Sequence, residues 1–190
     1  SSLAHLEQLW LGDNTLRGTL DALTTGASLP NLQVLQLENN KLTGEIFGGS
    51  VPPQPPFPPD SPDFSRMSNL ATVNLRNNRL YGVIPPVFGP FTTVLNLAGN
   101  LFSGELPTLP YLMRIVDLSN NSLSGTVSSN FLYSLGNAGV IKVNNNQLTG
   151  SIPDGFRGIN ALLSVMELDL RNNLFSGALF IRLALGWNLY

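Results

Sequence analysis

The sequence predicts an α/β solenoid, in which short coils stack on one another and share one parallel β-sheet. Three observations predict this fold. An asparagine recurs at intervals of 26, 38, 22, 21, 25 and 27 residues, apolar residues hold fixed positions on both sides of it, and a glycine always stands four residues after it. Self-similarity at a period of about 20–50 residues is typical of repeat architectures, whose coils bury a continuous core only when stacked.

The recurring asparagines serve as anchors for the repeat. They are Asn14, Asn40, Asn78, Asn100, Asn121, Asn146 and Asn173. Apolar residues stand five and three positions before each anchor, and this alternation predicts a short strand with one buried face. The residues five before are Leu9, Leu35, Val73, Leu95, Val116, Ile141 and Leu168. Those three before are Leu11, Leu37, Leu75, Leu97, Leu118, Val143 and Leu170.

The positions after each anchor are equally regular. Leucine or phenylalanine comes two residues later, glycine four later, and an aliphatic residue six later. The glycines are Gly18, Gly44, Gly82, Gly104, Gly125, Gly150 and Gly177. Glycine here suits a tight turn or a close approach between neighbouring coils.

Each anchor asparagine is expected to turn the chain inward at the end of its strand. A buried amide must be hydrogen-bonded, and the free backbone groups of its own and the adjacent coil are its natural partners. We therefore expect the anchors to form a structural ladder through the stack.

The pattern L-x-x-N-x-L-x-G-x-[IL]-P resembles the plant-specific class of leucine-rich repeats. It stands most fully at residues 75–85 (LRNNRLYGVIP) and recurs at 143–153 and 97–107. The resemblance implies a right-handed superhelix with a concave parallel sheet, a second short strand near the Gly-x-Ile-Pro segment, and a convex side of loops and 3₁₀ turns. Members of the class include ectodomains of receptor-like kinases and receptor-like proteins, and secreted inhibitors of cell-wall-degrading enzymes.

The array is expected to occupy residues 1–190 as a single domain, with about seven recognisable repeats and a truncated terminal one. The paired cysteines of the usual capping modules are missing, because the chain has no cysteine. Residues 48–63 form a proline-rich insertion. Dense proline favours extended polyproline geometry, so this segment is either a solvated loop on the convex side or a docking strip with Phe57 as anchor.

The exposed strand positions, four and two before each anchor, define the predicted partner-binding concave face. The residues four before are Trp10, Gln36, Asn74, Asn96, Asp117, Lys142 and Asp169. Those two before are Gly12, Glu38, Arg76, Ala98, Ser119, Asn144 and Arg171. Such a polar face of mixed sign fits a protein or peptide, with Trp10 as the best anchor and with Arg76 and Arg171 able to make bidentate contacts.

Other chemistry has no support in the sequence. His5 is the only histidine and cysteine is absent, so we expect no metal site and no cofactor. Acidic residues such as Glu38, Asp117 and Asp169 belong to different coils, without a nucleophile and base beside them, so no catalytic residues are predicted. The net charge of −2 argues against a nucleic-acid partner, and no apolar run is long enough for this segment to enter a membrane. Asn120 begins an N-x-S sequon and is a candidate glycosylation site.

The sequence favours the ligand-recognition segment of a cell-surface receptor-like protein, located outside the cell. Two alternatives stay open: a secreted inhibitor that wraps a hydrolase, and a structural adaptor inside or outside the cell. Repeat consensus describes the scaffold and not the partner.

Overall fold

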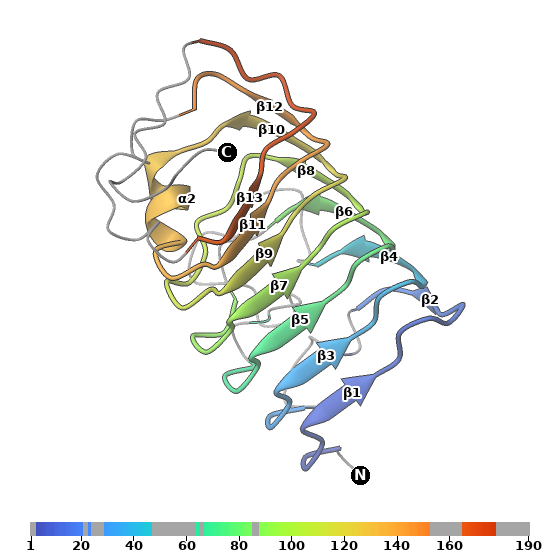
Figure 1. Ribbon diagram of the computed structural model, residues 1–190. Helices are drawn as coiled ribbons and strands as arrows, with labels where there is room; N and C mark the ends of the chain where they lie inside the picture. Colours follow the sequence, from blue (N-terminus) through green and yellow to red (C-terminus); the bar gives the residue numbers. More distant parts are fainter. Residues whose placement is uncertain are drawn as a thin grey trace, which may run out of the picture.

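A computed structural model describes residues 3–20, 23, 29–46, 64, 67–84, 88–152 and 165–177. The proline-rich insertion at 48–63 lies outside these residues. The described coils follow one another along a single axis, from the N-terminal end at the bottom of Figure 1 to the C-terminal coils at the top.

One strand from each coil enters a parallel seven-stranded sheet. The strands are β1 (Gln8–Trp10), β3 (Val34–Gln36), β5 (Thr72–Asn74), β7 (Val94–Asn96), β9 (Ile115–Asp117), β11 (Val140–Lys142) and β13 (Glu167–Asp169), in that spatial order. Equivalent residues of successive coils are in register, as Val73 is with Leu95. The repeat spacing therefore predicts the strand pairing, and the expected concave parallel sheet is confirmed.

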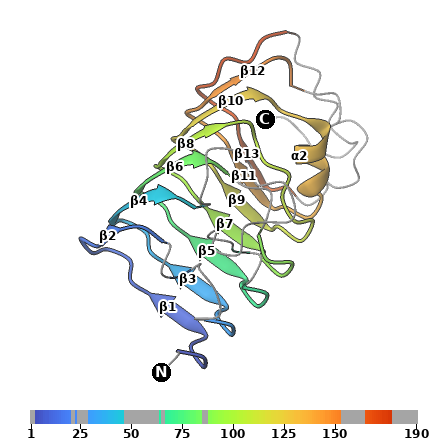
Figure 2. The same cartoon turned by 180° about the vertical axis from the view of Figure 1, so that it is seen from behind.

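A second parallel sheet follows the anchor asparagines. It contains β2 (Arg17–Gly18), β4 (Lys41–Glu45), β6 (Arg79–Val83), β8 (Leu101–Gly104), β10 (Ser122–Thr126) and β12 (Gln147–Thr149). Its spatial order is β12-β10-β8-β6-β4-β2, as the view from behind shows (Figure 2). This is the second short strand that the resemblance implied.

A short helix, α2 (Ser129–Ser134), lies in the connection between β10 and β11. The hydroxyl of Ser128 caps it by accepting a hydrogen bond from the Phe131 amide at 3.1 Å. The helix buries Phe131 and Leu132 against the core. The resemblance implied loops and 3₁₀ turns in these connections, and a helix at this place was not predicted.

The core runs between the two sheets as columns of equivalent apolar side chains. Leu35, Val73, Leu95 and Val116, all five before an anchor, are fully buried. Burial falls at the first coil, where Leu16 is 39% exposed, because among the described residues only one neighbouring coil packs against it. The stack thus supplies each coil with a core that a single coil lacks.

The predicted asparagine ladder is present and links consecutive coils. The Asn100 side chain donates to the carbonyls of Leu75 (2.9 Å), Leu97 (3.1 Å) and Ala98 (3.4 Å), and accepts from the Leu80 amide at 3.1 Å. The same pattern recurs at Asn40, Asn78, Asn121, Asn146 and Asn173. Asn14, in the first coil, bonds only to the carbonyls of its own coil, Leu11 and Gly12.

The glycine column serves both expected purposes. At Gly104 the backbone has φ +84°, in the left-handed region that disfavours other residues. A Cβ atom there would also lie 2.9 Å from Cγ1 of Val83 in the preceding coil. Both the left-handed backbone and the close approach of the preceding coil therefore favour glycine at this position.

Candidate functional site

The exposed face of the seven-stranded sheet brings the predicted partner-binding residues together. The residues four before each anchor end their strands and lie side by side, as the pairings Trp10 with Gln36, Asn74 with Asn96 and Lys142 with Asp169 show. Trp10 is 61% exposed, and its indole nitrogen donates to Gln8 at 3.2 Å. The alternation of buried and exposed positions thus makes one continuous surface from residues far apart in the chain.

Several side chains of this row also have a structural task. The side-chain oxygens of Asn74, Asn96, Asp117 and Asp169 each accept a hydrogen bond from the backbone amide two residues later, at 3.1–3.3 Å. This bond stabilises the turn that leaves the strand. From the sequence these residues were predicted only as partner contacts, although Asn and Asp at one recurring position before a turn are the signal for such bonds.

The row of residues two positions before the anchors is less exposed to solvent than expected. Ala98 and Ser119 are buried, which corrects their assignment as exposed positions. Their side chains are short, and the Ser119 hydroxyl is held within the turn by a 2.6 Å hydrogen bond to Asp117. Arg76 and Arg171 are exposed as predicted.

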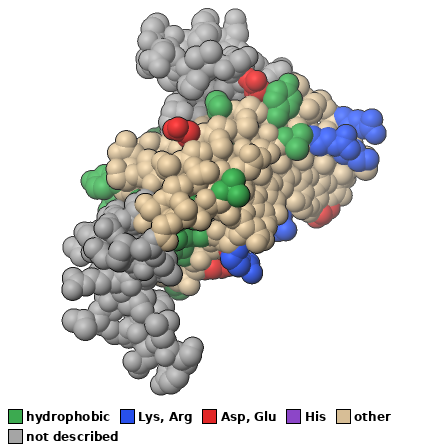
Figure 3. All heavy atoms as spheres, turned by 90° about the horizontal axis from the view of Figure 1, so that it is seen from above, with side chains coloured by type: hydrophobic (Ala, Val, Ile, Leu, Met, Phe, Trp, Pro, Cys, Tyr) green, Lys and Arg blue, Asp and Glu red, His purple; other side chains and the backbone are tan. Residues whose placement is uncertain are grey.

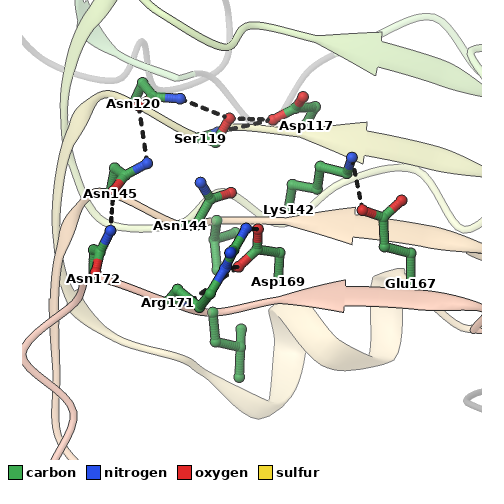
Figure 4. A network of polar contacts seen from close by, with 12 residues as sticks. Asp117, Ser119, Asn120, Lys142, Asn144, Asn145, Glu167, Asp169, Arg171 and Asn172 are labelled. Carbon is green, nitrogen blue, oxygen red and sulfur yellow. Dashed lines mark hydrogen bonds and ion pairs between the residues drawn. The ribbon is translucent and has the colours of Figure 1, made fainter.

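The C-terminal part of the face contains two ion pairs (Figure 4). Arg171 binds Asp169 through two hydrogen bonds, of 2.9 and 2.7 Å, and Lys142 lies 2.8 Å from Glu167. The bond from Arg171 lowers the pKa of the Asp169 carboxyl, and the bond to Glu167 raises the pKa of the Lys142 ammonium group. A carboxylate of a partner would have to displace Asp169 to reach Arg171 in full.

Arg76 differs from Arg171. Among the described residues, its guanidinium group has no hydrogen-bond or ion-pair partner. A planar guanidinium in this state offers a bidentate site to a carboxylate. The two arginines, both predicted to be able to make bidentate contacts, therefore differ, and Arg76 is the one whose guanidinium group is available.

Two buried acceptors on this face have no hydrogen-bond partner among the described residues: Oε2 of Glu38 and Oδ1 of Asn144. Figure 4 shows Asn144 between Asp117 and Asp169. Glu38 lies over Gly12, where a Cβ atom would come within 2.6 Å of Oε1. Unpaired buried acceptors are unfavourable, so each oxygen would gain a hydrogen bond if its side chain turned toward a donor.

A third exposed row, six before each anchor, was missed by the sequence analysis. Its residues are Gln8, Val34, Thr72, Val94, Ile115, Val140 and Glu167. The middle of the row is apolar and partly exposed, so an aliphatic stripe runs beside the polar rows. Extending the same alternation by two residues would have found it.

Comparison with known proteins agrees with this architecture. Residues 31–50, 69–91 and 112–134 match the Leucine Rich Repeat family. A probable inactive receptor kinase of Arabidopsis thaliana is 36% identical over 139 residues, which cover 67% of this chain and 13% of that protein. The chain is a leucine-rich-repeat protein of the plant type. It spans only a small share of the length of such relatives.

Solved plant ectodomains have the same leucine-rich-repeat fold. The ectodomain of the Arabidopsis thaliana receptor kinase GASSHO1/SCHENGEN3, in complex with CASPARIAN STRIP INTEGRITY FACTOR 2, has a TM-score of 0.74 at 28% identity over 91% of this chain and 19% of that one. The Arabidopsis receptor kinase HAESA ectodomain, in complex with an IDA peptide hormone ligand, has a TM-score of 0.69 at 27% identity over 90% of this chain and 26% of that one.

A second line of side chains in this leucine-rich-repeat protein was also missed. The residue before each anchor has φ near +54° wherever it is Asn or Asp, and these side chains bond to one another along the stack. Asn77 donates to Asn39 at 2.7 Å, Asn145 to Asn120 at 3.0 Å, and Asn172 to Asn145 at 2.6 Å. The residue type could have predicted this backbone conformation, because Asn and Asp tolerate the left-handed region.

Asn120, the candidate glycosylation site, belongs to this second line. Its side chain is exposed, but its amide nitrogen donates to the Ser119 hydroxyl at 3.2 Å and its oxygen accepts from Asn145. A glycan on that nitrogen would compete with the first bond. Glycosylation at Asn120 stays a prediction.

Within the described ranges, no three His, Cys, Asp or Glu side chains are placed to hold a metal ion. No helix in that part of the chain is both long and apolar enough to cross a membrane.

Proposed function

We propose that this chain is the ligand-recognition segment of a cell-surface receptor-like protein. In this proposal the face of the seven-stranded sheet binds a peptide or an extended protein segment. The observation that carries the proposal is the combination, on one exposed sheet face, of Trp10 at 61% exposure with an exposed Arg76 that has no ion-pair partner among the described residues. The solved ectodomains bound to a peptide hormone or an integrity factor support it.

The rows of this face suit a polypeptide. The aliphatic stripe at Val94, Ile115 and Val140 offers apolar area, while the neighbouring rows offer acceptors and a free guanidinium group. A polypeptide presents amide donors, carboxylates and apolar side chains together. A polyanion would meet Asp117 and Asp169 on the same surface, so it fits less well.

The proposed setting is the cell exterior, as for the ectodomains that this chain resembles. The segment contributes recognition and no chemistry. A membrane span or a kinase elsewhere in a longer protein would be compatible with this proposal.

The test is selection of binders from a random-peptide library displayed on phage, with the whole chain as bait. Peptides that occupy the sheet face should bind about tenfold or more weakly to Trp10→Ala or Arg76→Ala, as expected for interface anchors. Calorimetry or fluorescence anisotropy with the selected synthetic peptides measures the change.

The matched control is Arg79→Ala. Arg79 lies three residues from Arg76 but on β6 of the other sheet, is also exposed, and has no ion-pair partner among the described residues. Seen from above in Figure 3, basic side chains gather at the end of the molecule where Figure 1 places β2 and β4, so nonspecific attraction of acidic peptides to this end is the alternative to exclude. Equal losses with Arg76→Ala and Arg79→Ala would contradict the proposal.

A further inference from the structure

A third set of asparagines ties together the loops that precede the strands of the seven-stranded sheet. Nine residues before their anchors, the side chains of Asn31, Asn69 and Asn137 each donate to a backbone carbonyl of the preceding coil. The acceptors are the carbonyls of Ala4 (2.6 Å), Pro30 (3.0 Å) and Tyr111 (3.2 Å). We call this position the edge column, since it borders the sheet where its strands begin.

Two consecutive coils in the middle of the edge column depart from the pattern. Phe91 and Leu112 stand where Asn69 and Asn137 stand in the coils on either side. Both lie three residues before their strands, and Val94 pairs with Ile115, so the two side chains are neighbours one strand spacing apart. No edge-column amide then reaches the Ser68 and Pro90 carbonyls. These two coils therefore lack the edge-column hydrogen bond to the preceding coil, and each has a large apolar side chain at that position.

These side chains are exposed rather than buried. Five residues form what we call the edge patch, with these exposed fractions: Phe91 57%, Tyr111 51%, Leu112 46%, Ile115 39% and Tyr133 69%. The rings of Tyr111 and Tyr133 lie 6.1 Å apart, which joins helix α2 to the patch. Figure 1 shows the loops before β7 and β9 beside each other at the start of the sheet, and Figure 2 shows the same edge from behind.

A contiguous aromatic and aliphatic patch of this kind marks an interaction surface rather than ordinary solvated exterior. Tyr and Phe are the residues that interfaces concentrate, because they bury large area with little loss of side-chain entropy. At Phe91 and Leu112 the exposed apolar side chains replace the asparagine that ties the coils together elsewhere, so the stack itself does not require them there.

A basic residue beside the patch in sequence defines the partner. Arg114 is exposed, stands two residues after Leu112, and has no ion-pair partner among the described residues. At its position the neighbouring coils have Thr93 and Gly139, neither of which is acidic. The complementary surface is therefore apolar in its centre and carries a carboxylate.

We propose that the edge patch is a second docking surface, adjoining the sheet face at Ile115, for a protein segment whose leucine, phenylalanine or tryptophan side chain is flanked by aspartate or glutamate. The apolar side chain packs among Phe91, Leu112 and Tyr111, and its neighbouring carboxylate accepts from Arg114.

The test uses the double variant Phe91→Asn with Leu112→Asn in the whole chain. It replaces the patch with the residue that the edge column has elsewhere, and the new amides can bond to the carbonyls of Ser68 and Pro90. The variant therefore removes the proposed surface while keeping the fold, which its melting temperature checks. A random-peptide library displayed on phage is the probe, selected on the unaltered chain and counter-selected on the variant.

The expected outcome is a set of peptides that bind the variant about tenfold or more weakly and contain an apolar residue next to an acidic one. Arg114→Gln should weaken the same peptides, whereas Arg76→Ala on the sheet face should leave them unchanged. No patch-dependent peptide, or patch-dependent peptides indifferent to Arg114→Gln, would overturn the proposal. Light scattering adds one further outcome: a dimer of the unaltered chain that dissociates in the double variant would make a second copy the occupant instead, and would overturn it too.

Discussion

The anchor ladder and the edge column are both built from asparagines that bond to the preceding coil, yet they differ in how strictly the residue is kept. The ladder has asparagine in every repeat, and each middle-coil amide, such as Asn100, makes four hydrogen bonds in a buried turn. The edge column has asparagine at positions 31, 69 and 137, makes one cross-coil bond each time, and lies in solvent.

The difference follows from the hydrogen bonds that are lost when each asparagine is replaced. Removing a buried amide leaves several backbone groups without partners and without water, and each such group is unfavourable. Removing an exposed amide leaves one carbonyl that water can reach. An exposed position with a single bond is therefore where a repeat protein can change its surface without weakening its stack, and Phe91 and Leu112 occupy such positions.

The largest expected effect is at the centre of the ladder. Asn121→Leu should lower the free energy of unfolding by about 1–3 kcal/mol, because it removes the amide that bonds to the carbonyls of Leu97, Leu118 and Ser119 and to the Phe102 amide. Urea unfolding measures the loss. Asn14→Leu is the matched control, since Asn14 is exposed and bonds only within its own coil, and its loss should be clearly smaller.

Much of this stack was predictable from the sequence. A repeat of fixed apolar, asparagine and glycine positions determines strand register, core and ladder together, because each column has one physical reason. The rows on the surface were harder to predict. The bond of the half-buried Asn74 to its own turn was signalled by its residue type at a recurring position but was not predicted. The pairing of Arg171 with Asp169 depends on side-chain geometry that spacing does not encode.

The edge patch was likewise not predicted. Phe91 and Leu112 each look like ordinary loop residues in the sequence. They differ from the edge-column pattern, but this can be recognised only from the structure. There Asn31, Asn69 and Asn137 each make a hydrogen bond to the preceding coil.

An intermediate effect is expected at Gly99, which interrupts the second line of asparagines. Its φ of +66° is in the left-handed region, and a Cβ atom there would collide with Oδ1 of Asn77. Gly99→Ala should lower the free energy of unfolding by about 1–2 kcal/mol, the usual penalty for a left-handed residue with a Cβ atom. Thermal unfolding measures it, and a stability equal to that of the unaltered chain would show that the turn relaxes freely.

The smallest loss is expected in the edge column itself. Asn137→Ala removes only the bond to the Tyr111 carbonyl, so the free energy of unfolding should fall by about 0.5–1.5 kcal/mol at most. Chemical denaturation of the two proteins in parallel gives the value. A loss as large as that of Asn121→Leu would remove the distinction between the two columns.

The most direct test of that distinction is the unfolding free energy of Leu112→Asn, measured beside that of Asn121→Leu in the same buffer. The structure predicts that Leu112→Asn keeps or slightly raises stability, because the new amide can bond to the Pro90 carbonyl, while Asn121→Leu loses about 1–3 kcal/mol. A substantial loss in Leu112→Asn would mean that Leu112 holds the fold together, and would contradict the view that the edge patch serves a partner.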